Sequence, residues 1–383
     1  MKRMTCSLII IVLAVLWAVS CSPAPAATQA PAAAPTAAPV DTLAPAPTAA
    51  SVDTPAPAPT EDPSAAPLKV LFFVNGSLDD KNYFGPIYQG ILQAQQELGF
   101  ESNFFEAGLD KGDYLPILEQ VAGMADYDIM VLASQDMGKA LNTVAPKFPG
   151  KKFILLDGPV DGFDNVFPVA IAIDAGSYLA GLYAGLMTGE TTLQGINADN
   201  KVGVVGGMDM PFIKAYLEAF KAGAVAAGVP PENVLMGYAG DFGDPEKGKQ
   251  AALPMYAGGA DIVYQVAGGA GMGVFDAARE SGAYAIGIDY DQALSLEPTN
   301  PDLARVILTS IQKDLTAAAY KAVSMAANGT LEYGQAASWG LAEGVVGLVK
   351  NKYYDEYTPD EVKAKIDQAE KDLQAGTLTV PAN

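Results

Sequence analysis

The sequence contains no histidine and only two cysteines, and these absences exclude several classes of site. Cys6 and Cys21 both lie in the amino-terminal segment, so the remainder of the chain has no thiol. A disulfide framework, a cysteine-ligated zinc site and a cysteine nucleophile are therefore excluded there. Without histidine, Ser-His-Asp and Cys-His catalysis, H-E-x-x-H metal sites and the commonest general base are excluded too.

Basic residues are also scarce. The chain has 23 Lys and Arg against 44 Asp and Glu, which gives a formal net charge of −21. Nucleic acid and anionic membrane surfaces are therefore unsuitable partners, because both require basic patches. Half of the residues are apolar and 17% are charged, so the folded part can bury a large core. We expect no cofactor and no metal ion.

The amino-terminal segment has the layout of a secretory signal. Lys2 and Arg3 precede an apolar stretch at 8–19, and small residues lead to Cys21. A cysteine at this point predicts a bacterial lipoprotein, in which Cys21 is lipidated and becomes the first residue of the mature chain. We therefore expect a lipid anchor in the cell membrane, on its extracytoplasmic face, either periplasmic or at the cell surface. The alternative is an ordinary signal peptide with an incidental cysteine.

Residues 22–67 consist almost wholly of Ala, Pro and Thr. Such a segment has too little apolar surface to fold, and its prolines favour extended geometry. We predict a disordered tether that reaches on the order of 100 Å, at about 3.1 Å per residue. The expected domains are thus a signal at 1–21, a tether at 22–67 and a substrate-binding domain at 68–383.

From residue 68 onward, short β-branched or aromatic runs alternate with longer amphipathic segments. The predicted strands are 69–74, 128–133, 152–156, 201–206, 261–266 and 284–288. The predicted helices include 87–98, 112–124, 176–188, 211–228, 245–258, 272–282 and 313–327. This alternation predicts α/β architecture with parallel, doubly wound sheets. The length favours two Rossmann-like lobes around a hinge-bounded cleft: about 68–173 plus about 292–335, and about 174–291 plus the C-terminal segment.

A doubly wound sheet binds its ligand outside the carboxyl ends of its strands. The residues at those positions are 75–76, 134–136, 157–158, 207–209, 265–269 and 289–291. Acids, amides and glycines dominate this set, and it contains neither arginine nor lysine. A nucleotide is therefore an unsuitable ligand, whereas a neutral ligand rich in hydroxyl and NH groups suits these acceptors. Asn75, Ser134 and Gln265 are candidate contacts on this ground.

Two aspartates are the strongest candidates from position alone. Asp289 closes the apolar strand 284–288, where a carboxylate can accept two hydrogen bonds from a vicinal diol. The alternative is a helix N-cap or a structural acid at the crossing between lobes. Asp157 follows strand 152–156 and is similar in kind.

Four further candidates lie outside the predicted strands. Tyr83 and Phe84 open the first helix, where an aromatic ring can stack on a planar base; the alternative is a core contact. Gly268 lies in the glycine-rich stretch 267–273, which is not G-x-G-x-x-G and has no Walker lysine. Its glycines are interpreted either as a tight turn or as backbone NH groups near an uncharged ligand. Lys313 is either a donor to a ligand hydroxyl or part of a surface salt bridge.

These motifs coincide with those of a known family. The chain resembles the basic membrane protein family, the PnrA-like purine-nucleoside-binding lipoproteins of ABC transporters. The segments that carry the resemblance are 76–83 with Gly90, 177–181, 201–207, 263–275, 286–292, 308–310 with Lys313, and 339–347. They span most of 68–350, and the resemblance implies a type I periplasmic-binding-protein fold.

The resemblance also implies roles for individual residues. The aromatic residue of the family's D-K-S-F-N segment, which stacks on the base, falls on Tyr83, and the family's asparagine falls on Phe84. Asp80 lies in the same segment. Asp289 matches the aspartate that engages ribose, while Lys313 and Asp157 match a lysine and an acid of the family pattern. One departure is Asn75, where the family's first strand usually ends in an aspartate.

The resemblance implies a monomeric binding protein, not an enzyme, that captures a nucleoside, in particular a purine nucleoside, for an ABC permease. Three other hypotheses remain open at this point. The chain could bind a sugar or another small polar metabolite, which fewer stacking aromatics would favour. It could serve as a sensor subunit. It could be an exported nucleoside hydrolase or lyase, although no histidine, metal cluster or activated nucleophile accompanies its carboxylates.

Overall fold

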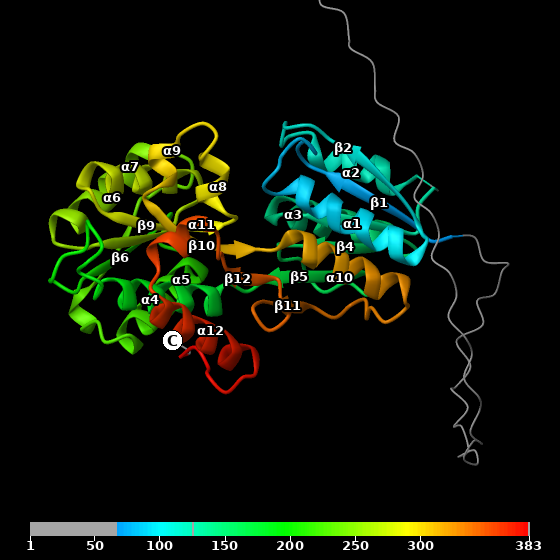
Figure 1. Cartoon of the computed structure of the whole chain (residues 1–383). Coiled ribbons are helices and arrows are strands. Elements are labelled where there is room, and N and C mark those ends of the chain that lie inside the picture. Colours follow the sequence, from blue (N-terminus) through cyan, green and yellow to red (C-terminus); the bar gives the residue numbers. More distant parts are fainter. Residues whose placement is uncertain (1–66, 125, 382–383) are drawn as a thin grey trace, which may run out of the picture. The chain divides into compact units, whose positions relative to one another are not determined.

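The computed structural model describes residues 67–381 with the exception of residue 125. The predicted signal, the lipidation site Cys21 and the predicted tether up to residue 66 lie outside the described residues. The described part forms two lobes, each built on a six-stranded sheet with helices on both faces (Figure 1). The prediction of two doubly wound α/β lobes is confirmed. No helix among these residues is long and apolar enough to cross a membrane.

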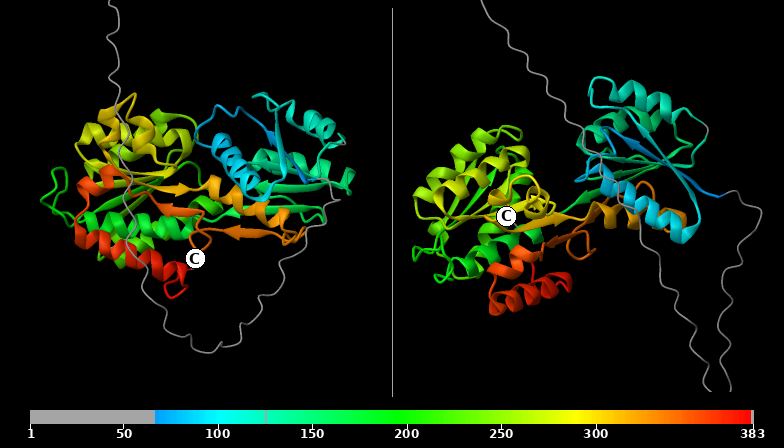
Figure 2. Two further views of the ribbon diagram at one scale, coloured as in Figure 1. Left: turned by 45° about the vertical axis from the view of Figure 1, so that its right-hand side comes forward. Right: turned by 45° about the horizontal axis from the view of Figure 1, so that its top comes forward.

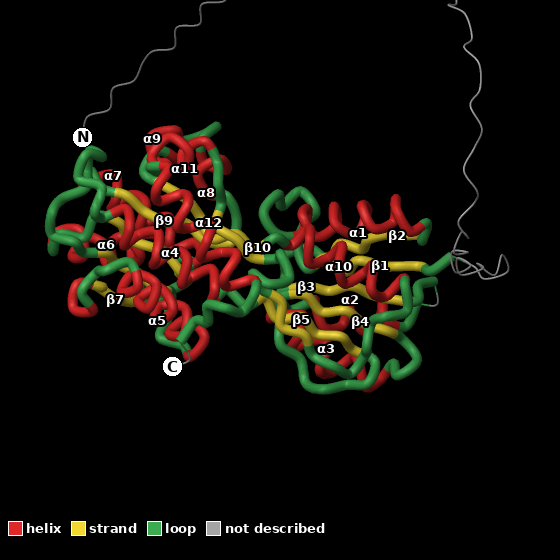
Figure 3. Tube along the Cα trace, turned by 60° about the horizontal axis from the view of Figure 1, so that its bottom comes forward, coloured by secondary structure: helices red, strands yellow, loops and turns green. Residues whose placement is uncertain are grey.

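The first lobe contains a wholly parallel sheet of strand order β11-β5-β4-β3-β1-β2. Helices α1 and α10 pack together on one face, and α2 and α3 pack together on the other (Figure 3). The strands are β1 (Lys69–Val74), β2 (Glu101–Glu106), β3 (Ile129–Ala133), β4 (Lys152–Leu156), β5 (Val166–Ile171) and β11 (Ala337–Trp339). The helices are α1 (Phe84–Leu98), α2 (Tyr114–Ala122), α3 (Gln135–Val144) and α10 (Leu315–Ala327).

The second lobe has the strand order β12-β10-β9-β8-β6-β7, in which only β12 runs antiparallel to its neighbour. The strands are β6 (Val202–Gly206), β7 (Val234–Tyr238), β8 (Ile262–Val266), β9 (Tyr284–Asp289), β10 (Ile307–Lys313) and β12 (Val346–Leu348). The helices are α4 (Asp174–Met187), α5 (Pro211–Ala226), α6 (Pro245–Ala257), α7 (Gly271–Ser281), α8 (Gln292–Leu296), α9 (Pro301–Ala304), α11 (Lys352–Tyr357) and α12 (Asp360–Gln374).

The chain crosses between the lobes three times: from β5 to α4, from β10 to α10, and from β11 to β12 (Figure 2). The second crossing lies later than predicted, because α8, α9 and β10 still belong to the second lobe and the chain returns only at Asp314. The prediction places this crossing too early because it misses β10, in which polar residues interrupt the apolar run. Thr309 and Ser310 are fully buried there, and the Thr309 hydroxyl donates to the Val349 carbonyl at 2.6 Å.

The central strands of both sheets are almost completely buried, which is why their apolar runs are visible in the sequence. Helix packing in the first lobe depends on one close approach. A Cβ atom at Gly90 of α1 would lie 2.2 Å from the carbonyl oxygen of Thr316 in α10. The absence of a side chain at Gly90 therefore lets α10, which follows the second crossing, lie directly on α1.

Candidate ligand-binding site

Four predicted residues meet where the carboxyl ends of the two sheets approach each other. Tyr83 precedes α1, Asp157 follows β4, and Asp289 and Lys313 end β9 and β10. The Tyr83 hydroxyl donates to Asp157 Oδ2 at 3.4 Å. Lys313 Nζ lies 3.3 Å from Asp157 Oδ2 and 3.4 Å from Asp289 Oδ1. These four side chains, here called the polar cluster, connect the first lobe with the second.

The polar cluster is largely shielded from solvent. The side chains of Lys313 and Asp157 are only 19% and 20% exposed, whereas that of Asp289 is 43% exposed. Burial raises the pKa of Asp157, although Lys313 opposes this shift. Burial also disfavours the charge on Lys313, but the attraction of Asp289 and Asp157 outweighs that effect, so the pKa of Lys313 is raised. Lys313 is therefore a charged donor between two acceptors.

The backbone at this edge is unusual. Ser134, Asp157 and Asp289 have φ angles of 91°, 54° and 70°, and they are three of the four described non-glycine residues with positive φ. L-residues adopt this region rarely, and such strain concentrates at ligand sites. All three lie directly at the ends of strands β3, β4 and β9. The strain therefore marks the same edge as the polar cluster.

Two adjoining cavities share Asp289 and Lys313. The first, of about 240 Å³, is polar and also contacts Tyr83 and Asp157. The second, of about 380 Å³, is lined mostly by apolar and aromatic side chains of the second lobe, and Gln135 of α3 contributes from the first lobe. Small-molecule sites commonly combine an apolar wall with a few convergent polar groups.

Three rings line the larger cavity: Phe212 and Tyr216 of α5, and Phe242 in the loop after β7. We call them the aromatic wall. A Cβ atom at Gly207 would lie 2.3 Å from the ring of Phe242, so the bare glycine leaves room for that ring. The aromatic wall is not among the predicted site residues: Phe242 follows β7, which is not among the predicted strands, whereas Phe212 and Tyr216 lie on a predicted helix rather than at the end of a strand. The sequence signal that could have found Phe242 is its place just after β7.

The other predicted residues do not line either cavity, with one exception. Gly268 contacts the larger cavity and has a φ of 56°. Asn75 is buried, and its Nδ2 donates to Ser134 Oγ at 3.2 Å. Gln265 is fully buried and donates to Gln292 Oε1 at 2.6 Å, which places it inside the second lobe.

Two neighbours of Tyr83 also serve local structure. Asp80 Oδ1 accepts a hydrogen bond from the backbone NH of Asn82 and thereby shapes the loop before α1. The ring of Phe84 packs edge-on to that of Tyr83, with centroids 5.0 Å apart, and against the core. The alternative role of Asp289 as an N-cap is not observed, because Asp291 caps α8 by accepting from the backbone NH of Leu294.

The strand-end set contains a cation after all. The prediction that it holds neither arginine nor lysine is wrong, because Lys313 ends β10, a strand that is not among those predicted. The predicted helix 313–327 begins two residues later, since Asp314 caps α10 by accepting from the backbone NH of Ala317 at 2.8 Å. Lys313 does form salt bridges, with Asp157 and Asp289, but they lie in the candidate site rather than on the surface.

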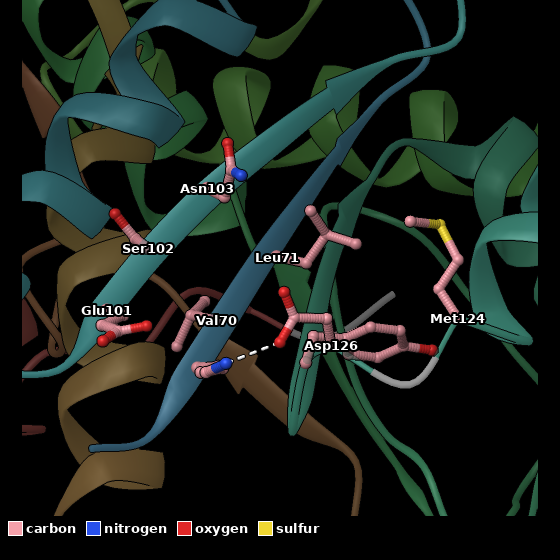
Figure 4. A pocket seen from close by; sticks show the side chains of 9 residues that line it. Val70, Leu71, Glu101, Ser102, Asn103, Met124 and Asp126 are labelled. Carbon is pink, nitrogen blue, oxygen red and sulfur yellow. Dashed lines mark hydrogen bonds and ion pairs between the residues drawn. The ribbon is translucent and has the colours of Figure 1, made fainter. Parts of the chain in front are cut away.

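Another hollow, of about 200 Å³, lies over the amino-terminal half of β1 and β2 (Figure 4). Its lining includes Leu71, Met124 and the ion pair between Lys69 and Asp126, whose charged atoms are 2.5 Å apart. It is far along the strands from their carboxyl ends, where ligands of doubly wound sheets bind. The two cavities at the polar cluster therefore form the candidate site. Within residues 67–381, residue 125 excepted, no group of acidic side chains is placed to hold a metal ion.

Two doubly wound lobes, joined by three crossings and enclosing a polar cluster and an aromatic wall, define a two-lobed solute-binding protein. Residues 68–379 match the family described as ABC transporter substrate-binding protein PnrA-like. The chain belongs to this family. It is accordingly an extracytoplasmic binding protein rather than an enzyme, of the type that delivers small molecules to an ABC permease.

The chain is also similar to relatives with curated names. The chain is 30% identical to the CD4+ T-cell-stimulating antigen of Listeria monocytogenes over 80% of its own length and 85% of that protein. It is 28% identical to basic membrane protein A of Borreliella burgdorferi, over 82% and 88% of the two chains. It is 31% identical to an uncharacterized lipoprotein of Pyrococcus abyssi, over 77% and 72%.

Solved structures show the same fold. A solute-binding protein of an ABC transporter system from Aeropyrum pernix K1 aligns with a TM-score of 0.64 and 23% identity, and covers 83% of this chain and 94% of its own. A periplasmic ribose ABC transporter protein from Conexibacter woesei aligns with a TM-score of 0.58 and 14% identity, over 76% and 95%. The predicted type I periplasmic-binding-protein fold is confirmed.

Proposed function

We propose that this chain is a monomeric, lipid-anchored component of an ABC importer, and that it captures a nucleoside, in particular a purine nucleoside. The observation that carries this proposal is the adjacency of the polar cluster and the aromatic wall across a shared Asp289 and Lys313. A nucleoside has the same two parts, a hydroxylated sugar and a flat base. One ligand of that kind would occupy both cavities.

The sugar would bind at the polar cluster. Asp157 and Asp289 can accept hydrogen bonds from ribose hydroxyls, and the ammonium group of Lys313 can donate to their oxygens. Because these groups contact one another directly, ribose would replace the Lys313 contacts with contacts of its own. Asn82 and Tyr290 border the same cavity.

The base would bind along the aromatic wall. Base–aromatic stacking contributes about 1–3 kcal/mol per base, and it needs only a flat apolar surface. Phe242 supplies such a surface in the second lobe, and the ring of Tyr83 borders the neighbouring polar cavity from the first lobe. Gln135, which borders the larger cavity, offers a side-chain amide to the edge of the base.

Phosphorylated ligands should be rejected. The polar cluster holds two carboxylates and one ammonium group, so a 5′-phosphate dianion would enter a site that already has an excess of negative charge. Burying an unpaired like charge costs several kcal/mol. Nucleosides, but not their 5′-monophosphates, should therefore bind.

A second candidate ligand is a monosaccharide. The polar cavity by itself, about 240 Å³ with Asp157, Asp289 and Lys313, offers the donors and acceptors that a sugar needs. The ribose transporter protein from Conexibacter woesei has the same fold. In that case the aromatic wall would remain outside the contact surface of the ligand.

The test is native mass spectrometry of protein purified without refolding, followed by calorimetry with adenosine, guanosine, their 5′-monophosphates and ribose. We expect a retained mass equal to that of a nucleoside, and at least about 100-fold weaker binding of the monophosphates, which is the several kcal/mol of like-charge repulsion expressed as affinity. Tight binding of ribose with no nucleoside binding would replace the proposal with the monosaccharide. Equal affinity for adenosine and its monophosphate would contradict the electrostatic argument.

Two observations support the lipid anchor. Cys21 follows the apolar signal stretch and small residues. A relative that is 31% identical to this chain carries the name lipoprotein. Because Cys21 precedes a long Ala/Pro/Thr-rich segment, the anchored domain would be held at a distance from the membrane while remaining close to its permease.

A further inference from the structure

Large apolar side chains remain exposed in the second lobe at the entrance to the larger cavity. Met208, Phe212 and Phe242 are 44%, 38% and 36% exposed. Phe212 and Phe242 line the cavity itself, and Met208 directly follows Gly207, over which the ring of Phe242 lies. We call these three residues the apolar lip. Large apolar side chains that stay exposed beside a cavity commonly mark a surface that is covered in another state or by a partner.

The first lobe carries one exceptional side chain on the same side of the site. Leu109 is 81% exposed, the highest exposure of any large apolar residue in the described chain. It lies in loop 107–113, between β2 and α2. Lys111 ties this loop to α3, since its Nζ lies 2.7 Å from Asp136 Oδ2. Asp136 follows Gln135, which lines the larger cavity together with Phe242.

Topology places the loop and the apolar lip at corresponding positions in the two lobes. β2 and β7 are the outer strands of their sheets, whereas the crossings leave from the opposite side, at β5, β10, β11 and β12. The loops that follow β2 and β7 at the carboxyl ends are therefore the parts of the cleft rim that lie farthest from the crossings. They contain Leu109 and Phe242 respectively.

We propose that Leu109 packs on the apolar lip when the lobes close over a ligand, and that this contact slows ligand release. The proposal rests on the proposed function only in its choice of ligand. Closure would remove an exposed leucine and three exposed apolar side chains from water together, which stabilises the closed form. Because the contact forms after the ligand has entered, its loss should increase the dissociation rate and leave the association rate nearly unchanged.

Stopped-flow measurement of adenosine binding to Leu109→Asp tests this inference. We expect a rise of about three- to tenfold in the dissociation rate with little change in the association rate. Leu98→Asp is the matched control, because Leu98 is a 40% exposed leucine at the far end of α1. A dissociation rate of Leu109→Asp equal to that of Leu98→Asp would overturn the proposal.

A second measurement does not depend on the identity of the ligand. The described part of the chain contains no cysteine, so Leu109→Cys with Met208→Cys, in the Cys21→Ser background, introduces the only possible disulfide there. Disulfide formation by this pair under mild oxidant, faster than in a Leu98→Cys with Met208→Cys control, supports contact on closure. No disulfide beyond the control level overturns it. If no nucleoside binds, the proposed function fails, while the disulfide experiment still tests whether Leu109 contacts the apolar lip.

Discussion

At the scale of single residues, the polar cluster combines groups whose charges depend on one another. Lys313 stands between Asp157 and Asp289, at 3.3 and 3.4 Å, and the Tyr83 hydroxyl donates to Asp157 within the first lobe. Burial and the adjacent Asp157 raise the pKa of Tyr83 well above its usual value, so its phenol stays protonated and donates. Removing one member therefore changes the hydrogen bonding of the others.

Substitution of Tyr83 separates its ring from its hydroxyl. If the ring stacks on a base, Tyr83→Ala should weaken nucleoside binding by about 1–3 kcal/mol and ribose binding much less, because ribose has no flat ring. Tyr83→Phe keeps the ring and loses only the bond to Asp157, so its cost should stay near 1 kcal/mol. Calorimetry with adenosine and ribose measures both. Equal losses for Tyr83→Ala and Tyr83→Phe would exclude stacking.

Asp289 should behave differently. If it accepts the ribose hydroxyls, Asp289→Ala should weaken the binding of adenosine and ribose alike, by about 1.5–3 kcal/mol for hydrogen bonds to a charged group. The unmodified protein should already bind 2′-deoxyadenosine less tightly than adenosine. Titration of both proteins with the three ligands tests this. A variant that lost adenosine binding but kept that of ribose would place Asp289 at the base instead.

The raised pKa of Asp157 predicts how stability depends on pH. A carboxyl group whose pKa is raised by folding binds protons more tightly in the folded state. Its contribution to stability is therefore complete below the unfolded pKa, near 3.9, and is lost as the pH rises through the folded value. Asp157→Asn should remove this loss. The melting temperature of the variant should therefore rise relative to that of the parent protein as the pH increases from 4 to 7. A constant difference across that range would contradict the sign.

At the scale of elements, helices α4 and α5 pack more closely than ordinary side chains permit. A Cβ atom at Gly181 of α4 would lie 1.8 Å from the Phe220 carbonyl oxygen in α5. Gly181→Ala should therefore force the two helices apart and lower the free energy of unfolding by about 1–3 kcal/mol. Gly150→Ala is the control, because no heavy atom lies within 4 Å of a Cβ placed there. Urea unfolding compares them, and equal stabilities would contradict the packing argument.

The strands that the sequence predicts are the buried ones with continuous apolar runs. The buried strands β1, β3 and β4 match their apolar runs within one residue at either end. The edge strand β2 is harder to predict, because it reads ESNFFE and mixes exposed with half-buried positions, since one of its edges faces solvent.

The candidate site likewise contains residues that the sequence predicts and residues that it does not. Asp157 and Asp289 are predictable because each follows a recognised strand. Phe242 is not, because it follows the edge strand β7, whose Gly237 interrupts the apolar pattern. The contact between Lys313 and Asp157 spans 156 residues of sequence, and no local pattern encodes a pairing of that range.

At the scale of the whole molecule, anchoring is separable from binding. Cys21→Ser should release the protein from membranes, because the proposed lipid would be attached to that sulfur. The substitution lies outside residues 68–379, which match the binding-protein family, so nucleoside affinity should remain unchanged. Fractionation in detergent-free buffer followed by calorimetry on the soluble form measures both. Continued sedimentation with membranes would contradict the lipid anchor.

The three crossings also impose an order on biosynthesis. The first lobe begins with β1, yet α10, which covers one face of its sheet, and β11, at its edge, emerge only after β6 to β10 of the second lobe. The second lobe in turn receives β12 and α12 last. A nascent chain that has not passed residue 315 therefore leaves one face of the first sheet uncovered beside α1. Neither lobe is a contiguous segment of the chain, so a truncation that keeps only one lobe would remove strands or helices from the lobe that it keeps.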